Sequence, residues 1–178
     1  MVFNEHPPET DAPLTFVPPM IENPAEVSQS DLQHTHIPAI ISRQFGKGKI
    51  TYLPWDLGAL YNRLALPAHA QLLTDIIDKL LPSGRQITTS AHSSVEMVMC
   101  RKEGMPAQLL HLINLSGQAN NAYKEAIPMR DIAISVKGKF TAAASRKGNL
   151  KLPIEHKDDY SSFVLPVLND YDVIVIGE

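Results

Sequence analysis

An apolar stretch in the second half of the chain reads QLLHLINL, at residues 108–115, and decides the fold. Its apolar side chains fall on both faces of an extended backbone, which is typical of a central strand covered on both sides. From Arg85 onward the apolar residues repeat with a period of 2, and turn clusters such as RKEG (101–104) and RKGN (146–149) separate the repeats. Strands without intervening helices predict an antiparallel β-sandwich over residues 85–178. The other expected strands are 86–89, 95–100, 131–136, 140–144, 162–166 and 171–176.

The region before the sandwich, residues 37–84, has a different pattern. Strands are expected at 38–45 and 49–54, joined by a Gly46-Lys47-Gly48 turn into a hairpin. The Gly46-Lys47-Gly48 sequence lacks P-loop spacing, so a turn is favoured over a phosphate cradle. A short helical segment follows Asp56, and a longer helix is predicted over 67–81, with proline at its first position and one wide apolar face.

A hairpin with one or two helices cannot form a stable domain alone. Residues 37–84 are therefore interpreted as a partial α/β unit that packs on the sandwich or is completed by another chain. Residues 1–36 are expected to be an extended segment, because seven of the 14 prolines lie in the first 38 residues. The predicted fold class is α+β, with domains at 1–36, 37–84 and 85–178.

Composition excludes several classes of protein. The 178 residues carry a net charge of -3, whereas a general nucleic-acid binder shows a strong basic excess. A single cysteine, Cys100, excludes an internal disulfide and a multi-cysteine zinc site. No apolar run approaches the roughly 18 residues of a membrane span. Residues 1–10 contain no basic group and do not read as a secretory signal. A cytoplasmic chain without nucleic-acid, membrane or cofactor partners is expected.

The sequence shows no convincing catalytic set. Glycoside hydrolysis needs two carboxylates flanking the scissile bond, but the pairs Asp158-Asp159 and Asp170 with Asp172 fall in hydrophilic turns, where acids are usually solvated. His34 and His36 could share a metal on one strand face, yet no third ligand is marked, so a solvated loop is favoured. His111, within the apolar strand, is expected to be hydrogen-bonded and structural rather than catalytic.

One aromatic cluster offers a binding hypothesis. Trp55 is followed by Asp56 and, a few residues later, by Tyr61. An aromatic face beside a carboxylate can hold a sugar, because the C–H face stacks on the ring and the acid accepts hydroxyl protons. The competing and favoured interpretation is that the single tryptophan fills the core between hairpin and helix.

Two sets of motifs indicate a family. PAII (38–41) followed by FGKGKITYLPW (45–55) resembles the last hairpin of the β-galactosidase trimerisation-type domain, which has a class I glutamine-amidotransferase-like α/β fold. SVEM (94–97), LHLINLSG (110–117) and LPVLNDYDVIVI (165–176) resemble the small β-sandwich that follows that domain. The order is similar to family 42 β-galactosidases, and closer to glycosyl hydrolases in which a fucosidase-like TIM barrel precedes both domains. The resemblance covers about residues 14–178.

The resemblance implies a carbohydrate-enzyme context without catalysis in this chain. In such proteins the catalytic acids belong to the barrel, which alone needs about 200 residues, so no catalytic residue is carried over to any position here. The leading hypothesis is a non-catalytic C-terminal part of a glycoside-hydrolase-like protein, with a structural or oligomerisation role beside a catalytic barrel or a second copy. Two alternatives stay open: a stand-alone carbohydrate-binding module using Trp55 and Tyr61, and an assembly protein that pairs through the hairpin edge. Whether Met1 is the natural start also stays open.

Overall fold

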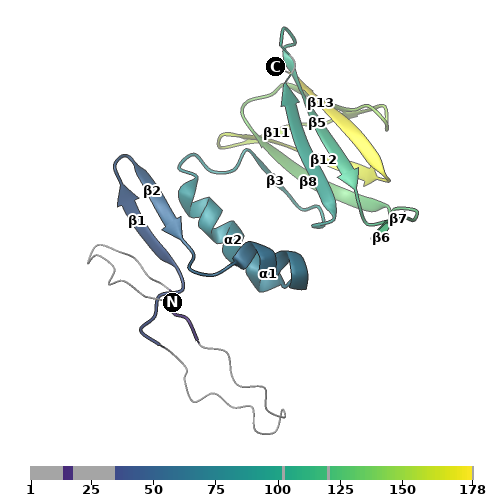
Figure 1. Cartoon of the computed structure of the whole chain (residues 1–178). Coiled ribbons are helices and arrows are strands. Elements are labelled where there is room, and N and C mark those ends of the chain that lie inside the picture. Colours follow the sequence, from purple (N-terminus) through teal and green to yellow (C-terminus); the bar gives the residue numbers. More distant parts are fainter. Residues whose placement is uncertain (1–13, 18–34, 102, 120, 178) are drawn as a thin grey trace. The chain divides into compact units, whose positions relative to one another are not determined.

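A computed structural model describes residues 14–17, 35–101, 103–119 and 121–177. The chain divides into two compact units, residues 1–84 (unit 1) and 85–178 (unit 2) (Figure 1). Most of the predicted extended segment 1–36, including His34 of the proposed histidine pair, lies outside the described residues.

Unit 1 contains the predicted hairpin and two helices. Strands β1 (Ile41–Phe45) and β2 (Gly48–Tyr52) pair antiparallel, and Gly46 adopts the positive φ that the turn requires. Before the hairpin, Phe16 N–H donates to the Ile37 carbonyl at 2.7 Å and Ala39 N–H to the Leu14 carbonyl at 2.8 Å. Residues 14–16 therefore lie antiparallel beside 37–39.

Both helices of unit 1 begin where local chemistry favours it. The Asp56 carboxylate accepts a hydrogen bond from Ala59 N–H at 2.9 Å and so caps α1 (Leu57–Leu64). Helix α2 (Pro67–Leu80) starts with proline at its first turn, where a missing N–H costs nothing. The predicted 67–81 helix is thus confirmed, but no residue of α2 is buried.

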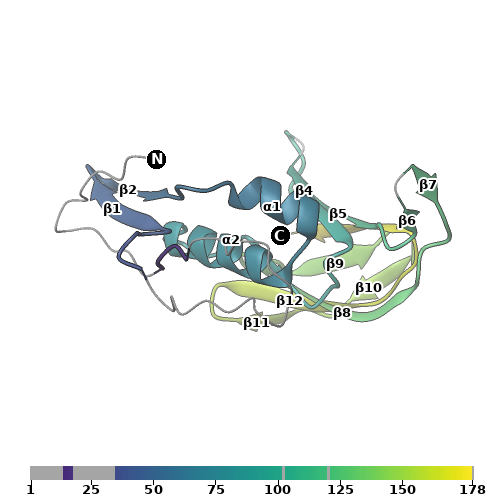
Figure 2. The same ribbon diagram turned by 60° about the horizontal axis from the view of Figure 1, so that its bottom comes forward.

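Unit 2 is a pair of antiparallel sheets around one core (Figure 1). One sheet has the order β10-β9-β13-β5-β4 and the other β11-β12-β8-β3. A separate two-stranded hairpin, β6–β7, projects from one end of the sandwich (Figure 2). The strand bounds are β3 (Ile87–Thr89), β4 (Val95–Arg101), β5 (Ala107–Asn114), β6 (Gln118–Ala119), β7 (Ala122–Tyr123), β8 (Met129–Lys137), β9 (Ala142–Ser145), β10 (Leu150–Leu152), β11 (Glu155–Lys157), β12 (Tyr160–Leu168) and β13 (Tyr171–Gly177).

The core of unit 2 follows from the period of 2. Alternate residues of β5, β8, β12 and β13 point inward, and this places Leu110, Leu112, Ile134, Leu165 and Ile174 among the fully buried side chains. The apolar stretch 108–115 is the strand β5, hydrogen-bonded to β13 on one side and β4 on the other. Its outward residues Leu109, His111 and Ile113 are half-buried. This arrangement is consistent with the predicted antiparallel β-sandwich.

The finer fold expectation for unit 1 is not confirmed. A glutamine-amidotransferase-like fragment belongs to an α/β domain with a parallel sheet, and every strand pair among the described residues is antiparallel. A hairpin and two helices alone do not distinguish a fragment of a glutamine-amidotransferase-like domain from a fragment of another α/β domain.

Candidate functional site

The predicted sugar platform has structural partners of its own. The Trp55 indole N–H donates to the Ala39 carbonyl at 2.7 Å, and its ring meets the His69 ring edge-on, 6.1 Å between centroids. Asp56 caps α1 through its carboxylate. Tyr61 lies within α1 and is exposed. Trp55 and Asp56 thus hold the start of α1 against the segment before β1, and carbohydrate contact at these three residues stays a prediction.

The acids in the sandwich do not form a facing pair among the described contacts. Asp158 lies in a turn at positive φ. Asp172, expected to be solvated, is instead only 3% exposed in β13, so that expectation was wrong. Its carboxylate accepts from Ser145 Oγ at 2.5 Å and from Lys147 N–H at 3.0 Å, which fixes the turn between β9 and β10. The carboxylate is buried because strand alternation puts it on the inner face of the sheet. The two hydrogen bonds offset the free-energy cost of burying its charge.

His111 is hydrogen-bonded, as expected, and its structural role stays a prediction. Its Nδ1 lies 2.7 Å from the Tyr171 hydroxyl on the neighbouring strand, and the two rings are tilted at 35°. No group of three or more His, Cys, Asp or Glu residues that could hold a metal occurs in the part of the chain that the structure describes. Within the same part, no helix is long and apolar enough to cross a membrane.

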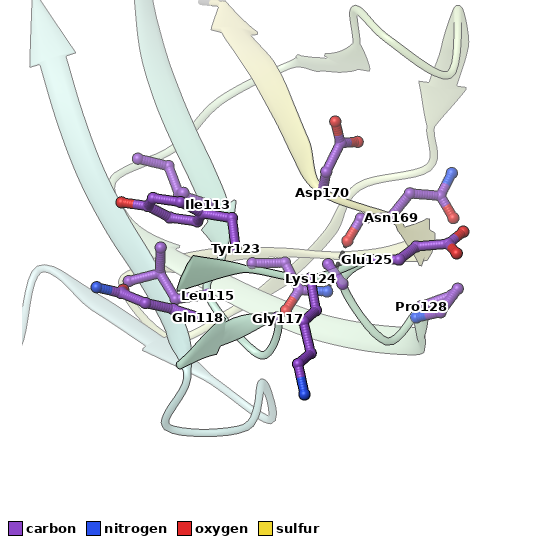
Figure 3. A pocket seen from close by; sticks show the side chains of 12 residues that line it. Ile113, Leu115, Gly117, Gln118, Tyr123, Lys124, Glu125, Pro128, Asn169 and Asp170 are labelled. Atoms are coloured by element: carbon purple, nitrogen blue, oxygen red, sulfur yellow. Dashed lines mark hydrogen bonds between the residues drawn. The ribbon is translucent and has the colours of Figure 1, made fainter. Parts of the chain in front are cut away.

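A pocket of about 520 Å³ opens in unit 2 where the β6–β7 hairpin meets the ends of β5 and β13. We call it the hairpin pocket; its lining residues are Ile113, Asn114, Leu115, Gly117, Gln118, Tyr123, Lys124, Glu125, Ala126, Pro128, Asn169 and Asp170. Pockets of about 300–1,000 Å³ are the usual size for small-molecule sites. Figure 3 shows the Tyr123 ring projecting to one side of the pocket and the Asn169 and Glu125 side chains to the other.

The base of the hairpin pocket is fixed by one buried side chain, Asn114, which is 6% exposed. Its Nδ2 donates to the carbonyl oxygens of Ile127 at 2.8 Å and Asn169 at 2.6 Å, and its Oδ1 accepts from Ser116 N–H at 3.1 Å. These bonds join the end of β5, the segment before β8 and the turn before β13. Because the amide uses both of its ends, it fixes these three segments relative to one another at the base of the pocket.

Close backbone contact tightens the hairpin further. Lys124 N–H donates to the Gly117 carbonyl at 2.8 Å, and a Cβ on Gly117 would lie 2.2 Å from the Lys124 carbonyl oxygen. Ser116 Oγ accepts from Ile127 N–H at 2.9 Å. The Asn-x-Ser-Gly sequence at 114–117 thus forms a turn to which three residues contribute. The Asn114 amide and the Ser116 hydroxyl form its hydrogen bonds, and Gly117 lacks the Cβ that would clash with Lys124.

The rim of the hairpin pocket carries both signs of charge. Asp170 forms an ion pair with Lys147. The hydrogen bond from the Lys147 ammonium, helped by backbone N–H groups, lowers the pKa of Asp170 below its ordinary value, so this carboxylate stays ionised at neutral pH. Glu125 adds a second carboxylate, and Lys124 extends away from both in Figure 3.

Sequence patterns alone did not mark this pocket as a site. Asn114 was visible as a residue that could satisfy a turn, but Gln118 and Tyr123 come from strands too short to show a period, and Glu125 lies in the segment after β7.

A second cavity, of about 660 Å³, lies within unit 1 between the β1–β2 hairpin and α2. Its apolar wall includes Ile40 from the segment before β1 together with Leu72, Ile76 and Leu80 from α2. Only Ala39, Ile40 and Leu57 are buried hydrophobic residues among those described in unit 1. On the apolar face of α2, Leu72, Leu73 and Ile76 are half-buried, whereas Ile77 and Leu80 are exposed.

Comparison with known proteins places the fold. No protein-family model and no curated protein sequence matches the chain. Among solved structures, α-L-fucosidase isoenzyme 2 from Paenibacillus thiaminolyticus matches with a TM-score of 0.66 and 12% identity, over 89% of this chain and 25% of that chain. This chain and that part of the fucosidase share a fold.

A second structure, a cycloisomaltooligosaccharide glucanotransferase of a Paenibacillus sp. complexed with cycloisomaltoheptaose, matches with a TM-score of 0.44 and 19% identity, over 60% of this chain and 20% of that chain. The chain therefore spans a quarter or less of the length of either structure.

Proposed function

We propose that this chain is a non-catalytic supporting part of a larger glycoside-hydrolase-like protein. The fold shared with the fucosidase supports this proposal, since it extends over both units but only a quarter of that enzyme. A glycosidase needs a pair of carboxylates across the scissile bond. In the described part of this chain, the buried Asp172 is engaged by Ser145 and Lys147, and Asp170 is paired with Lys147.

The observation that carries the proposal is the uncovered helix α2. A helix with an apolar face normally gains most of its stability by burying that face. In α2, Ile77 is 53% exposed and Leu80 is 38% exposed, while Leu72 and Ile76 line the cavity beside the hairpin. We infer that unit 1 is the closing part of an amidotransferase-like α/β domain, whose remaining strands, in the larger protein or in a second copy, cover this face.

The proposed role is structural rather than catalytic. Unit 1 supplies an apolar face for the rest of its domain or for a second copy, and unit 2 is a self-sufficient sandwich with its own core. Packed against a catalytic barrel, the pair braces the barrel or shapes contacts between subunits.

The test is an activity assay combined with a size measurement. The purified chain is incubated with aryl β-galactosides and aryl α-fucosides, and its mass is followed by sedimentation as concentration rises. The proposal predicts no hydrolysis above the buffer rate. It also predicts that Ile77→Glu weakens self-association and that Val164→Glu, at a similarly exposed residue of unit 2, leaves it unchanged. Enzyme-like turnover by the chain alone contradicts the proposal.

A further inference from the structure

The hairpin pocket combines a hydrogen-bonded base with exposed side chains. The buried Asn114 network fixes the base of the pocket, but the side chains above it are exposed. Tyr123 is 79% exposed at the end of β7, so its ring contributes little to the stability of the sandwich. An exposed aromatic ring beside a pocket is a suitable platform for a ligand with a flat apolar face.

The polar groups of the pocket define the ligand class. Carboxylates come from Glu125 and Asp170, amides from Gln118 and Asn169, and one ammonium from Lys124. Glu125 and Asp170 are balanced by Lys124 and by the Lys147 that pairs with Asp170, so the pocket has no excess of positive charge to attract an anion such as a phosphate ester. A metal ion is equally disfavoured, because no cluster of three ligating residues occurs among the described residues. Amides and carboxylates suit neutral hydroxyl groups, which donate to the carboxylates and both donate to and accept from the amides.

We propose that the hairpin pocket binds a neutral saccharide, with one pyranose ring stacked on Tyr123 and its hydroxyls bonded by Gln118, Asn169 and the rim carboxylates. The volume of about 520 Å³ is ample for a small saccharide. The choice of a sugar over another neutral polyol rests on the proposed carbohydrate function. The pocket itself is independent of Trp55, Asp56 and Tyr61, which lie in unit 1.

The Asp170–Lys147 ion pair contributes to this arrangement. Lys147 holds Asp170 ionised and also occupies part of its hydrogen-bonding capacity from outside the pocket. The Asp170 side chain is 68% exposed and Lys147 is not among the lining residues. Because a carboxylate accepts several hydrogen bonds, Asp170 can accept one from the pocket side while it is paired with Lys147. A hydroxyl that approaches Asp170 meets a charged acceptor at any pH above the lowered pKa.

The experiment is a titration of the ¹⁵N-labelled chain followed by NMR. The probes are L-fucose, D-galactose and lactose, with D-mannitol as an acyclic polyol and inorganic phosphate as the anion. Sugars are added to about 10 mM, enough to reveal a dissociation constant of about 1 mM. The proposal predicts that the cyclic sugars shift amides of residues 115–127 and 169–170, while mannitol and phosphate do not.

Variants of Tyr123 give the decisive comparison. Tyr123→Ala should weaken sugar binding about tenfold, because an aromatic stacking partner contributes on that order. Tyr123→Phe keeps the ring and should stay within about twofold. Tyr52→Ala is the matched control, since Tyr52 is 59% exposed in unit 1 and lies outside the pocket. Because both tyrosines are exposed, the folded amide spectrum should persist in every variant.

Several results overturn the inference. The absence of shifts at the highest sugar concentration excludes saccharide binding, and stronger shifts with phosphate exclude the neutral class. Sugar-dependent shifts centred on Trp55 and Tyr61 move the site to unit 1. Each of these outcomes leaves the non-catalytic role intact, because that role fails only if the chain hydrolyses glycosides.

Discussion

Replacing Asn114 by alanine tests whether one buried amide holds the hairpin pocket together. The substitution removes three hydrogen bonds, to the Ile127 and Asn169 carbonyls and from Ser116 N–H. Each is worth about 0.5–1.5 kcal/mol net, so the free energy of unfolding of unit 2 should fall by about 3 kcal/mol. For a domain of under 100 residues this corresponds to a drop in Tm of roughly 12–24 °C. Circular dichroism followed through thermal unfolding measures it.

Two further variants separate this cause from general damage to the loop. Asn121→Ala changes an exposed asparagine of the same loop and should alter stability by no more than about 0.5 kcal/mol. Asn114→Asp places a carboxylate against two carbonyl oxygens at neutral pH. Its destabilisation should shrink as the pH falls, because the protonated carboxyl can donate one hydrogen bond. A loss below about 1 kcal/mol for Asn114→Ala would refute the network as the anchor of the pocket.

Two other predictions concern the same end of the sandwich. Gly117→Ala should cost about 1–3 kcal/mol, because its Cβ would meet the Lys124 carbonyl oxygen; Gly177→Ala, whose Cβ would make only an ordinary contact, is the control in denaturant unfolding. Lys147→Ala should raise the pKa of Asp170 towards, but not fully to, its ordinary value of 3.8, because backbone N–H groups also lower it. Carboxyl ¹³C titration follows this shift. Since the folded-state pKa is lowered, the stabilisation by this pair is present above the unfolded pKa and disappears as pH falls through the folded value. An unchanged Asp170 titration in the variant excludes Lys147 as the main cause.

The sandwich could be predicted from the sequence because its signals are local and redundant. β5 and β13 show a buried residue at every second position, and apolar side chains on the inner face identify them without tertiary information. Strands β6, β7, β10 and β11 were missed because each has only two or three residues. A period of 2 is a weak signal over such lengths, although β3, with three residues, was expected at 86–89. Each of the missed strands pairs with a neighbouring strand.

The candidate site could be predicted only in part, because exposure and partners are tertiary properties. Trp55 was identified as the side chain of interest, and its bond to the Ala39 carbonyl depends on a segment 16 residues away. Asp172 was expected to be a solvated acid of a turn because it follows Asn169-Asp170-Tyr171. Its position in β13 instead directs its side chain into the core. Tyr123 carried no sequence signal, since an exposed tyrosine in a short strand resembles any surface residue.

Amide hydrogen exchange on the isolated chain tests the central claim that unit 1 is incomplete by itself. Exchange protection reports the free energy of local opening, which is low where few apolar contacts are buried. The account predicts weak protection for the amides of α2 and the β1–β2 hairpin, beside strong protection for β5 and β13 of unit 2. In a sample shown to be monomeric, α2 amides as strongly protected as those of β5 would contradict it.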